Sequence, residues 1–247
     1  MANWSDPRTT AAPYATAAGT RDAAYDAGLR SYMLSVYNYM ASGVLLSGVV
    51  ALLFAWGGPT SMAYSVFANG GPLAWLIILS PLAIVLAMSF GQNKMSTGTL
   101  QALFWGFAVL MGLSLSTLLL RYTGASVAQA FFATAAGFAG LSLYGYTTKR
   151  DLSGLGSFLI VGLIGLIVAS VINIFTQSST LSLIISFAGV LIFAGLTAYD
   201  TQRIKSMYAY VAGTDMVGKV VIMSALSLYL DFINMFQFLL SIIGNRD

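Results

Sequence analysis

Two aspartates stand inside apolar stretches of the sequence, where a charged side chain is rare. Asp200 lies within residues 196–202 and Asp231 within residues 228–234, and both runs are otherwise uncharged. An ionised aspartate at the centre of a membrane-spanning helix costs about 2.5–3.5 kcal/mol on insertion scales, so such a residue usually faces the bundle interior or a water-filled cavity. Asp200 and Asp231 are therefore the candidate functional pair.

The positions of the two aspartates predict that they lie at the same depth in neighbouring antiparallel helices. A turn-like segment at residues 213–215 falls midway between them, so each aspartate is about 15 residues, or roughly 22 Å of helix, from the turn. Whether the carboxylates face each other depends on the rotation of the two helices, which the spacing leaves open.

Two carboxylates that face each other in a low dielectric cannot both ionise at low cost, so they titrate as a coupled pair. With a proton bound, the pair can share a hydrogen bond that holds the helices together. Without it, repulsion can open a path that attracts cations. The pair would then be a proton sensor and a weak, transient calcium site. A tight calcium cage is not expected, because Ca²⁺ takes about 6–8 oxygen ligands.

A polar stripe accompanies one of the aspartates. Ser224, Ser227, Asp231 and Asn234 recur at intervals of three or four residues, so they share one face of an otherwise apolar helix. This pattern predicts a buried helix with one polar seam.

Three other interpretations use the same residues. In the first, each aspartate only bonds to neighbouring groups and holds helices together. The candidates for contact with the pair are Tyr199, Arg203, Tyr229 and Asn234. In the second, Tyr199-Asp200 is half of the signature of presenilin-type aspartyl proteases, but the Gly-x-Gly-Asp half is missing before Asp231. In the third, the chain regulates another membrane protein, which composition does not exclude.

The composition excludes several classes of protein. Of 247 residues, 58% are hydrophobic and only 8% are charged, and the mean hydropathy is +0.82. A soluble domain carries about 25% charged residues, so a soluble enzyme is excluded. The lack of histidine and cysteine excludes a His-based triad, a His-ligated metal and thiolate chemistry. Lys219, the one lysine of the last apolar segment, lies at its edge, which argues against a retinal Schiff base. We expect no enzymatic activity and no cofactor.

Seven apolar segments carry these residues, each long enough to cross a membrane as a helix. They run over residues 32–56, 73–90, 100–120, 127–147, 155–176, 181–203 and 218–243. The predicted fold is an all-α integral membrane protein with seven transmembrane helices. Residues 1–30 show no helical apolar stripe and are predicted to form a flexible cytoplasmic N-terminal tail. The transmembrane domain then covers residues 31–247.

The basic residues predict the orientation of the chain. Nine of the eleven fall on the side of the N-terminus, namely Arg8, Arg21, Arg30, Lys94, Lys149, Arg150, Arg203, Lys205 and Lys219. Arg121 and Arg246 fall on the other side. The positive-inside rule then places the N-terminus in the cytoplasm and the C-terminus outside. The basic residues stand singly, without a basic face, so the expected partner is the lipid bilayer and not nucleic acid.

Four motifs resemble the Bax inhibitor-1-like family, also called transmembrane Bax inhibitor motif proteins, and the chain is similar to its bacterial members. The motifs lie at residues 149–153, 173–175, 198–205 and 227–236. The last of them is the longest and most specific. The resemblance covers roughly residues 28–243.

The resemblance implies a bacterial inner-membrane protein in which six helices surround a central seventh. It also implies a pH-dependent calcium leak governed by a di-aspartyl sensor, to which Asp200 and Asp231 correspond. Other bacterial members are associated with modulating a membrane-bound ATP-dependent protease. The alternative function is therefore that of a non-conducting regulator of such a protease.

One family feature is absent from the sequence. Members that leak calcium can carry an arginine near the cytoplasmic end of the second helix, able to pair with the aspartate of the sixth. Residues 90–94 here read Phe-Gly-Gln-Asn-Lys, without arginine. Arg203, one turn beyond Asp200, and Lys94 are the candidate substitutes.

Overall fold

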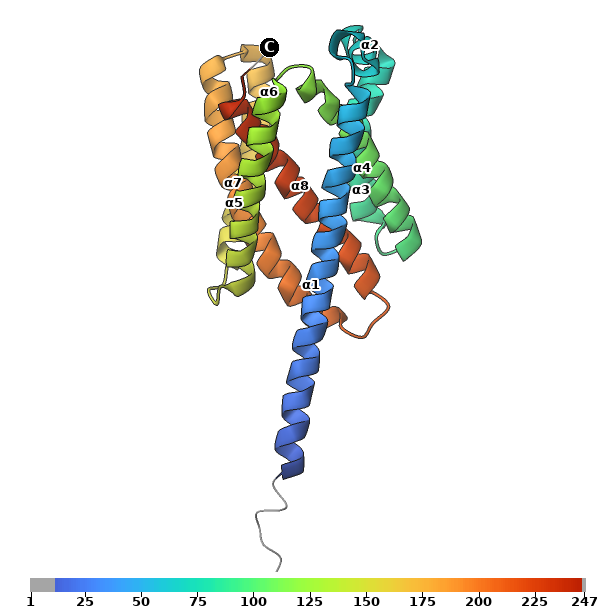
Figure 1. Ribbon diagram of the computed structural model, residues 1–247. Coiled ribbons are helices and arrows are strands. Elements are labelled where there is room, and N and C mark those ends of the chain that lie inside the picture. The colour runs from blue at the N-terminus through green and yellow to red at the C-terminus, as the bar shows by residue number, and fades with distance from the viewer. Residues whose placement is uncertain (1–11, 246–247) are drawn as a thin grey trace, which may run out of the picture.

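The computed structural model describes residues 12–245, with side chains from residue 23 onward, and every regular element in this range is a helix (Figure 1). The long helices are α1 (Ala12–Phe54), α3 (Pro72–Gly91), α4 (Thr97–Leu119), α5 (Gly124–Thr147), α6 (Ser153–Thr176), α7 (Ser179–Val211) and α8 (Val217–Ile243). All seven are long and apolar enough to span a membrane. The predicted class and number of spans are confirmed.

The loop after α1 contains two short helices that the sequence does not predict. They are the 3-10 turn η2 (Gly58–Thr60) and α2 (Met62–Ala68). The Ser61 hydroxyl accepts a hydrogen bond from the backbone N–H of Tyr64 at 3.1 Å and so caps the start of α2. Helix α2 also packs against α3 and α4 and buries Ala63, so capping and packing together stabilise it.

Helix α1 differs most from its prediction. The sequence predicts a flexible tail over residues 1–30, but α1 is already helical from Ala12, while residues 1–11 lie outside the described residues. Its 43 residues correspond to about 64 Å, roughly twice the hydrocarbon thickness of a bilayer. The ring of Tyr208 on α7 lies 5.2 Å from that of Tyr25 and 5.3 Å from that of Tyr32. This packing against α7 stabilises part of the segment that was expected to be a tail.

Helix α8 is the most buried span. Half of the residues in its most hydrophobic 18-residue stretch are buried, whereas the corresponding share for α6 is 11%. It packs against α1, α4, α5 and α7, whereas α3 packs mainly on α4 and α6 on α7. The predicted buried helix is therefore present, but a ring of six helices around it is not confirmed.

Close approach of α5 and α7 depends on glycine. A Cβ on Gly145 of α5 would overlap the carbonyl group of Ala198 on α7. Small residues allow such backbone proximity between membrane helices. The residues of α7 around Asp200 are thereby held against α5.

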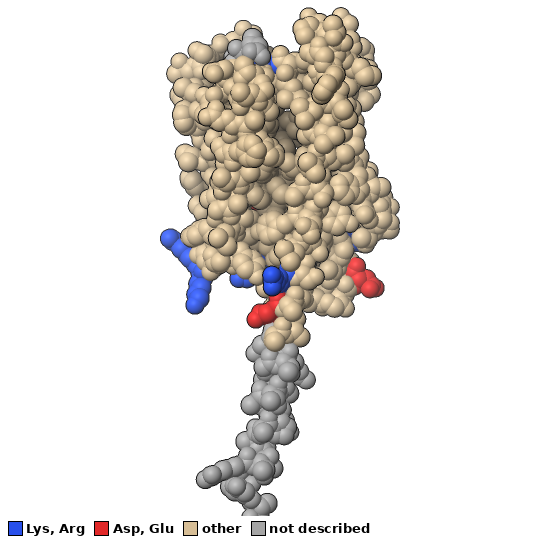
Figure 2. Space-filling model, viewed as in Figure 1, with Lys and Arg blue, Asp and Glu red and all other residues tan. Residues whose placement is uncertain are grey.

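Charged side chains gather at the end of the bundle from which α1 extends (Figure 2). We call this the basic end; it carries Lys94, Lys149, Arg150, Lys205 and Lys219 in the loops and helix ends of α3 to α8. At the opposite end, Arg121 is the one charged side chain of the described residues. The basic residues of the described chain therefore divide between the two ends of the bundle as the sequence predicts.

Candidate functional site

The two aspartates come together between α7 and α8. Ser227, one turn before Asp231 on α8, donates a hydrogen bond from its hydroxyl to Oδ2 of Asp200 on α7. Ser227 and Asp231 are four residues apart and share one face of α8, so Asp231 lies at the same interface as Asp200. The helix rotation that the sequence leaves open therefore directs both carboxyl groups to the same interface.

The two carboxyl groups have different surroundings. Asp200 is half-buried and lines a pocket. Asp231 is only 5% exposed, and its Oδ2 is buried without a hydrogen-bond partner. A buried polar atom without a partner is costly and rare, which makes it a candidate for a functional group.

The pocket beside Asp200 has a volume of about 350 Å³ and lies toward the basic end. Ser89 and Gln92 line it from α3, Arg203 from α7 and Ser224 from α8. Arg203 is the one basic side chain among its lining residues, and it acts on Asp200 through charge. We call this space the inner pocket.

A second pocket continues along the same side of α8 toward the Arg121 end. It measures about 470 Å³ and is lined by the polar side chains of Ser114 and Thr117 from α4 and Asn234 and Gln237 from α8. We call it the outer pocket. Its other nine lining residues are apolar. Polar side chains at membrane depth usually face the bundle interior or a water-filled cavity.

The inner and outer pockets share two lining residues, Val85 of α3 and Leu230 of α8. Both side chains are apolar and partly buried. An apolar constriction between two polar spaces can block ion passage by excluding water. The inner and outer pockets therefore adjoin at Val85 and Leu230.

Two of the predicted contact residues point elsewhere. The ring of Tyr199 covers Gly156 on α6. The hydroxyl of Tyr229 hydrogen-bonds to that of Ser47 on α1 at 2.6 Å, and its ring lies 4.9 Å from Phe107. Residues one or two positions apart do not share a helix face, which explains why each tyrosine turns away from its neighbouring aspartate.

The other two predicted contact residues line the pockets. Arg203 lines the inner pocket beside Asp200. Asn234 lines the outer pocket and donates from Nδ2 to the carbonyl of Leu230 at 2.8 Å. From α3, Gln92 lines the inner pocket and Lys94 does not. Arg203 is therefore better placed than Lys94 to act on the aspartate of α7.

The motif around Asp200 also fixes the loop between α5 and α6. Gln202 accepts from the backbone N–H of Leu152 at 2.9 Å and donates to the carbonyl of Arg150 at 2.8 Å. Lys205 donates to the carbonyl of Tyr146 at 2.8 Å. These side chains satisfy backbone groups that the helix ends leave free.

Asp151 belongs to that loop and lies outside the site. The hydroxyl and the backbone N–H of Ser153 donate to its carboxylate, which lowers the pKa of Asp151 below its usual value. The N–H···Oδ1 distance is 2.9 Å. Asp151 is thus a solvent-exposed carboxylate that stays ionised near neutral pH.

The donor set bears on how calcium could bind. Among the side chains described, those of residues 23–245, no three acidic groups cluster as metal ligands. Asp200 and Asp231, together with the Ser227 hydroxyl, offer fewer oxygens than the about 6–8 of a tight calcium site. Such a set is too small for a tight calcium cage.

The sequence does not single out Ser227 as the partner of Asp200, nor the polar residues of α3 and α4. Ser89, Ser114 and Thr117 are single hydroxyls in apolar segments, and such residues commonly bond to their own helix. Ser114 instead donates to the carbonyl of Ile77 on α3 at 3.1 Å. The sequence feature that could have identified Ser227 is the polar stripe on α8, to which it belongs.

Comparison with known proteins shows extensive similarity. Residues 29–247 match the family described as inhibitor of apoptosis-promoting Bax1. A protein of Rickettsia prowazekii is 49% identical over 228 residues, which cover 92% of this chain and 94% of that protein. The inner membrane protein YbhL of Escherichia coli is 45% identical over 224 residues, 89% and 94% of the two chains. A membrane protein of Streptococcus pyogenes is 38% identical over 222 residues, 90% and 96% of the two chains.

Proposed function

The chain belongs to the Bax inhibitor-1 family of membrane proteins, and from this premise we propose that it is a pH-sensitive calcium leak channel. The observation that carries the proposal is the contact between α7 and α8 at the aspartates, next to a polar pocket. The Ser227 hydroxyl joins α8 to Asp200 of α7. One turn further along α8, Oδ2 of Asp231 is buried without a hydrogen-bond partner.

In this proposal Asp200 and Asp231 are the proton sensor. A proton on the pair removes the repulsion between the carboxylates and keeps α7 and α8 together. Loss of that proton leaves two like charges at one interface, which separates the helices and attracts cations. Of the charged groups lining the inner pocket, Arg203 is the one cation, and it opposes that repulsion.

The path in this proposal runs along α8. It joins the outer pocket to the inner pocket at the basic end, past an apolar constriction formed by Leu230 and Val85. Movement of α8 relative to α3 at these two residues would open the constriction. We further propose that the basic end faces the cytoplasm, because short cytoplasmic loops carry the excess of lysine and arginine.

Calcium entry into proteoliposomes that contain the purified protein tests this function. A flux above that of empty liposomes, dependent on pH, is the expected result. The alternative is a non-conducting regulator of a membrane-bound ATP-dependent protease. Absence of flux at every pH, together with copurification of such a protease, would favour that alternative and overturn the channel.

A further inference from the structure

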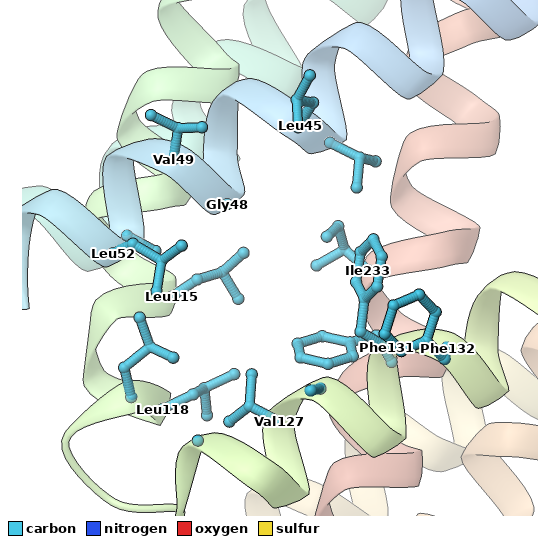
Figure 3. A pocket seen from close by; sticks show the side chains of 16 residues that line it. Leu45, Gly48, Val49, Leu52, Leu115, Leu118, Val127, Phe131, Phe132 and Ile233 are labelled. Carbon is cyan, nitrogen blue, oxygen red and sulfur yellow. The ribbon is translucent and has the colours of Figure 1, made fainter.

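An apolar groove of about 370 Å³ lies among α1, α4, α5 and α8 and shares Leu115 and Leu118 with the outer pocket (Figure 3). Figure 3 shows Leu45 and Leu52 of α1, Leu118 of α4, Phe131 of α5 and Ile233 of α8 around one open space. The volume is that of a small-molecule binding site. No polar side chain is among its lining residues.

Gly48 leaves the α1 wall of the groove open. A Cβ at this position would meet nothing within 4 Å. On either side of it, Leu45 is 69% and Leu52 58% exposed, so the groove lies on the membrane-facing surface of α1. An apolar space of this kind stays dry and accepts apolar guests. Within a bilayer, the apolar group available to occupy the groove is a lipid acyl chain.

Arg121 adds a charge to the segment that links the α4 and α5 walls of the groove. It lies between Leu118 and Gly124, both of which line the space. It is exposed and is the one charged side chain of the described residues at this end of the bundle. A guanidinium group binds phosphate with two parallel hydrogen bonds, and a long side chain at a helix end reaches the lipid headgroup level.

We propose that the groove binds one phospholipid, with an acyl chain along Gly48 and the phosphate on Arg121. The apolar groove accommodates the acyl chain. Arg121 selects a lipid with an anionic phosphate over an uncharged lipid. The site is separate from the aspartates and does not depend on the proposed channel function.

Photo-crosslinking tests the site. The full chain is placed in nanodiscs with phosphatidylglycerol that carries a diazirine in its acyl chain, and the labelled peptides are mapped by mass spectrometry. Diacylglycerol with the same labelled chain is the probe without phosphate. The exposed face of α6 reports the background labelling of any membrane surface.

In the wild type, phosphatidylglycerol should label the groove segments of α1, α4 and α5 above the level of α6. Gly48→Phe, or Ala128→Phe from the α5 wall if the first variant does not fold, should lose that excess. Gly140→Leu, on an open α5 surface outside the groove, should keep it. Arg121→Gln should lower phosphatidylglycerol labelling to that of diacylglycerol.

Two results would overturn the proposal. One is groove labelling no higher than that of α6, or unchanged by filling the groove from either wall. The other is equal labelling by the two probes in the wild type, which would remove the role of the phosphate and of Arg121.

Discussion

The hydroxyl of Ser227 on α8 donates a hydrogen bond to Oδ2 of Asp200 on α7, one helical turn from Asp231. The helices that carry the two aspartates are therefore joined by a polar contact at the pair itself. Asp200 lines the inner pocket, whereas Asp231 is buried behind it with an unpartnered oxygen. Titratable groups in such different environments can take different roles.

Loss of the Ser227 hydroxyl should weaken the contact between α7 and α8. Hydrogen bonds between membrane helices contribute about 0.6 kcal/mol on average and up to roughly 1.7 kcal/mol. We expect Ser227→Ala to lower the free energy of unfolding by an amount in this range, and therefore to lower the thermal unfolding temperature of the detergent-purified protein. Ser206→Ala is the control, because the Ser206 hydroxyl bonds only to the carbonyl of Arg203 in its own helix. Equal unfolding temperatures for the two variants would contradict the contact.

The apolar constriction gives a second prediction. Val85→Ser places a hydroxyl between the inner and outer pockets and should increase calcium flux at every pH, because water enters the constriction more easily. Leu86→Ser is the matched control, since Leu86 is 46% exposed and lines neither pocket. If Val85→Ser and Leu86→Ser both conduct like the wild type, the two pockets are not parts of one path.

Tyr229 should be structural and not part of the pH response. Its hydroxyl meets that of Ser47, which also donates to the carbonyl of Ala108 at 2.6 Å. Tyr229→Phe removes one hydrogen bond, worth about 1 kcal/mol, and should lower the unfolding temperature. The pH dependence of flux should stay as in the wild type; a shifted pH profile in this variant would show that the tyrosine acts on the aspartates.

The close approach of α5 and α7 gives a prediction of packing. Gly145→Ala would place a methyl group on the carbonyl of Ala198, and overpacking of this kind costs about 1–3 kcal/mol. The unfolding temperature should fall accordingly. At Gly140 a Cβ meets nothing within 4 Å, so Gly140→Ala should leave it unchanged or raise it. An equal loss in both variants would mean that the contact with Ala198 of α7 does not set the effect at Gly145.

The seven spans were predictable because hydropathy over about 20 residues is a strong local signal. The aspartates were identifiable for the same reason, as charges in apolar runs. The sequence could not give the rotation of α7 and α8, which depends on packing along their whole length. It therefore named Tyr199 and Tyr229 as contacts by proximity in sequence, although neither shares a face with its aspartate.

The start of α1 shows a different limit. Residues 12–30 have no apolar stripe, but several are alanine, which has the highest helix propensity. The contact of Tyr25 with Tyr208 of α7 joins residues far apart in the chain. Such long-range packing leaves no local pattern in the sequence. The sequence of residues 12–30 therefore could not distinguish a flexible tail from a helix.

The pH profile of calcium entry into proteoliposomes, from about pH 5 to 8, tests the proposed latch most directly. Asp151→Asn is the control, because its lowered pKa keeps Asp151 ionised across that range and it cannot supply the pH dependence. Flux should rise with pH in the wild type and in Asp151→Asn, as the aspartate pair loses its proton. It should be low and independent of pH in Asp200→Asn and Asp231→Asn, which imitate the protonated pair. A wild-type profile retained in Asp231→Asn, or no flux above empty liposomes in any variant, would contradict the account.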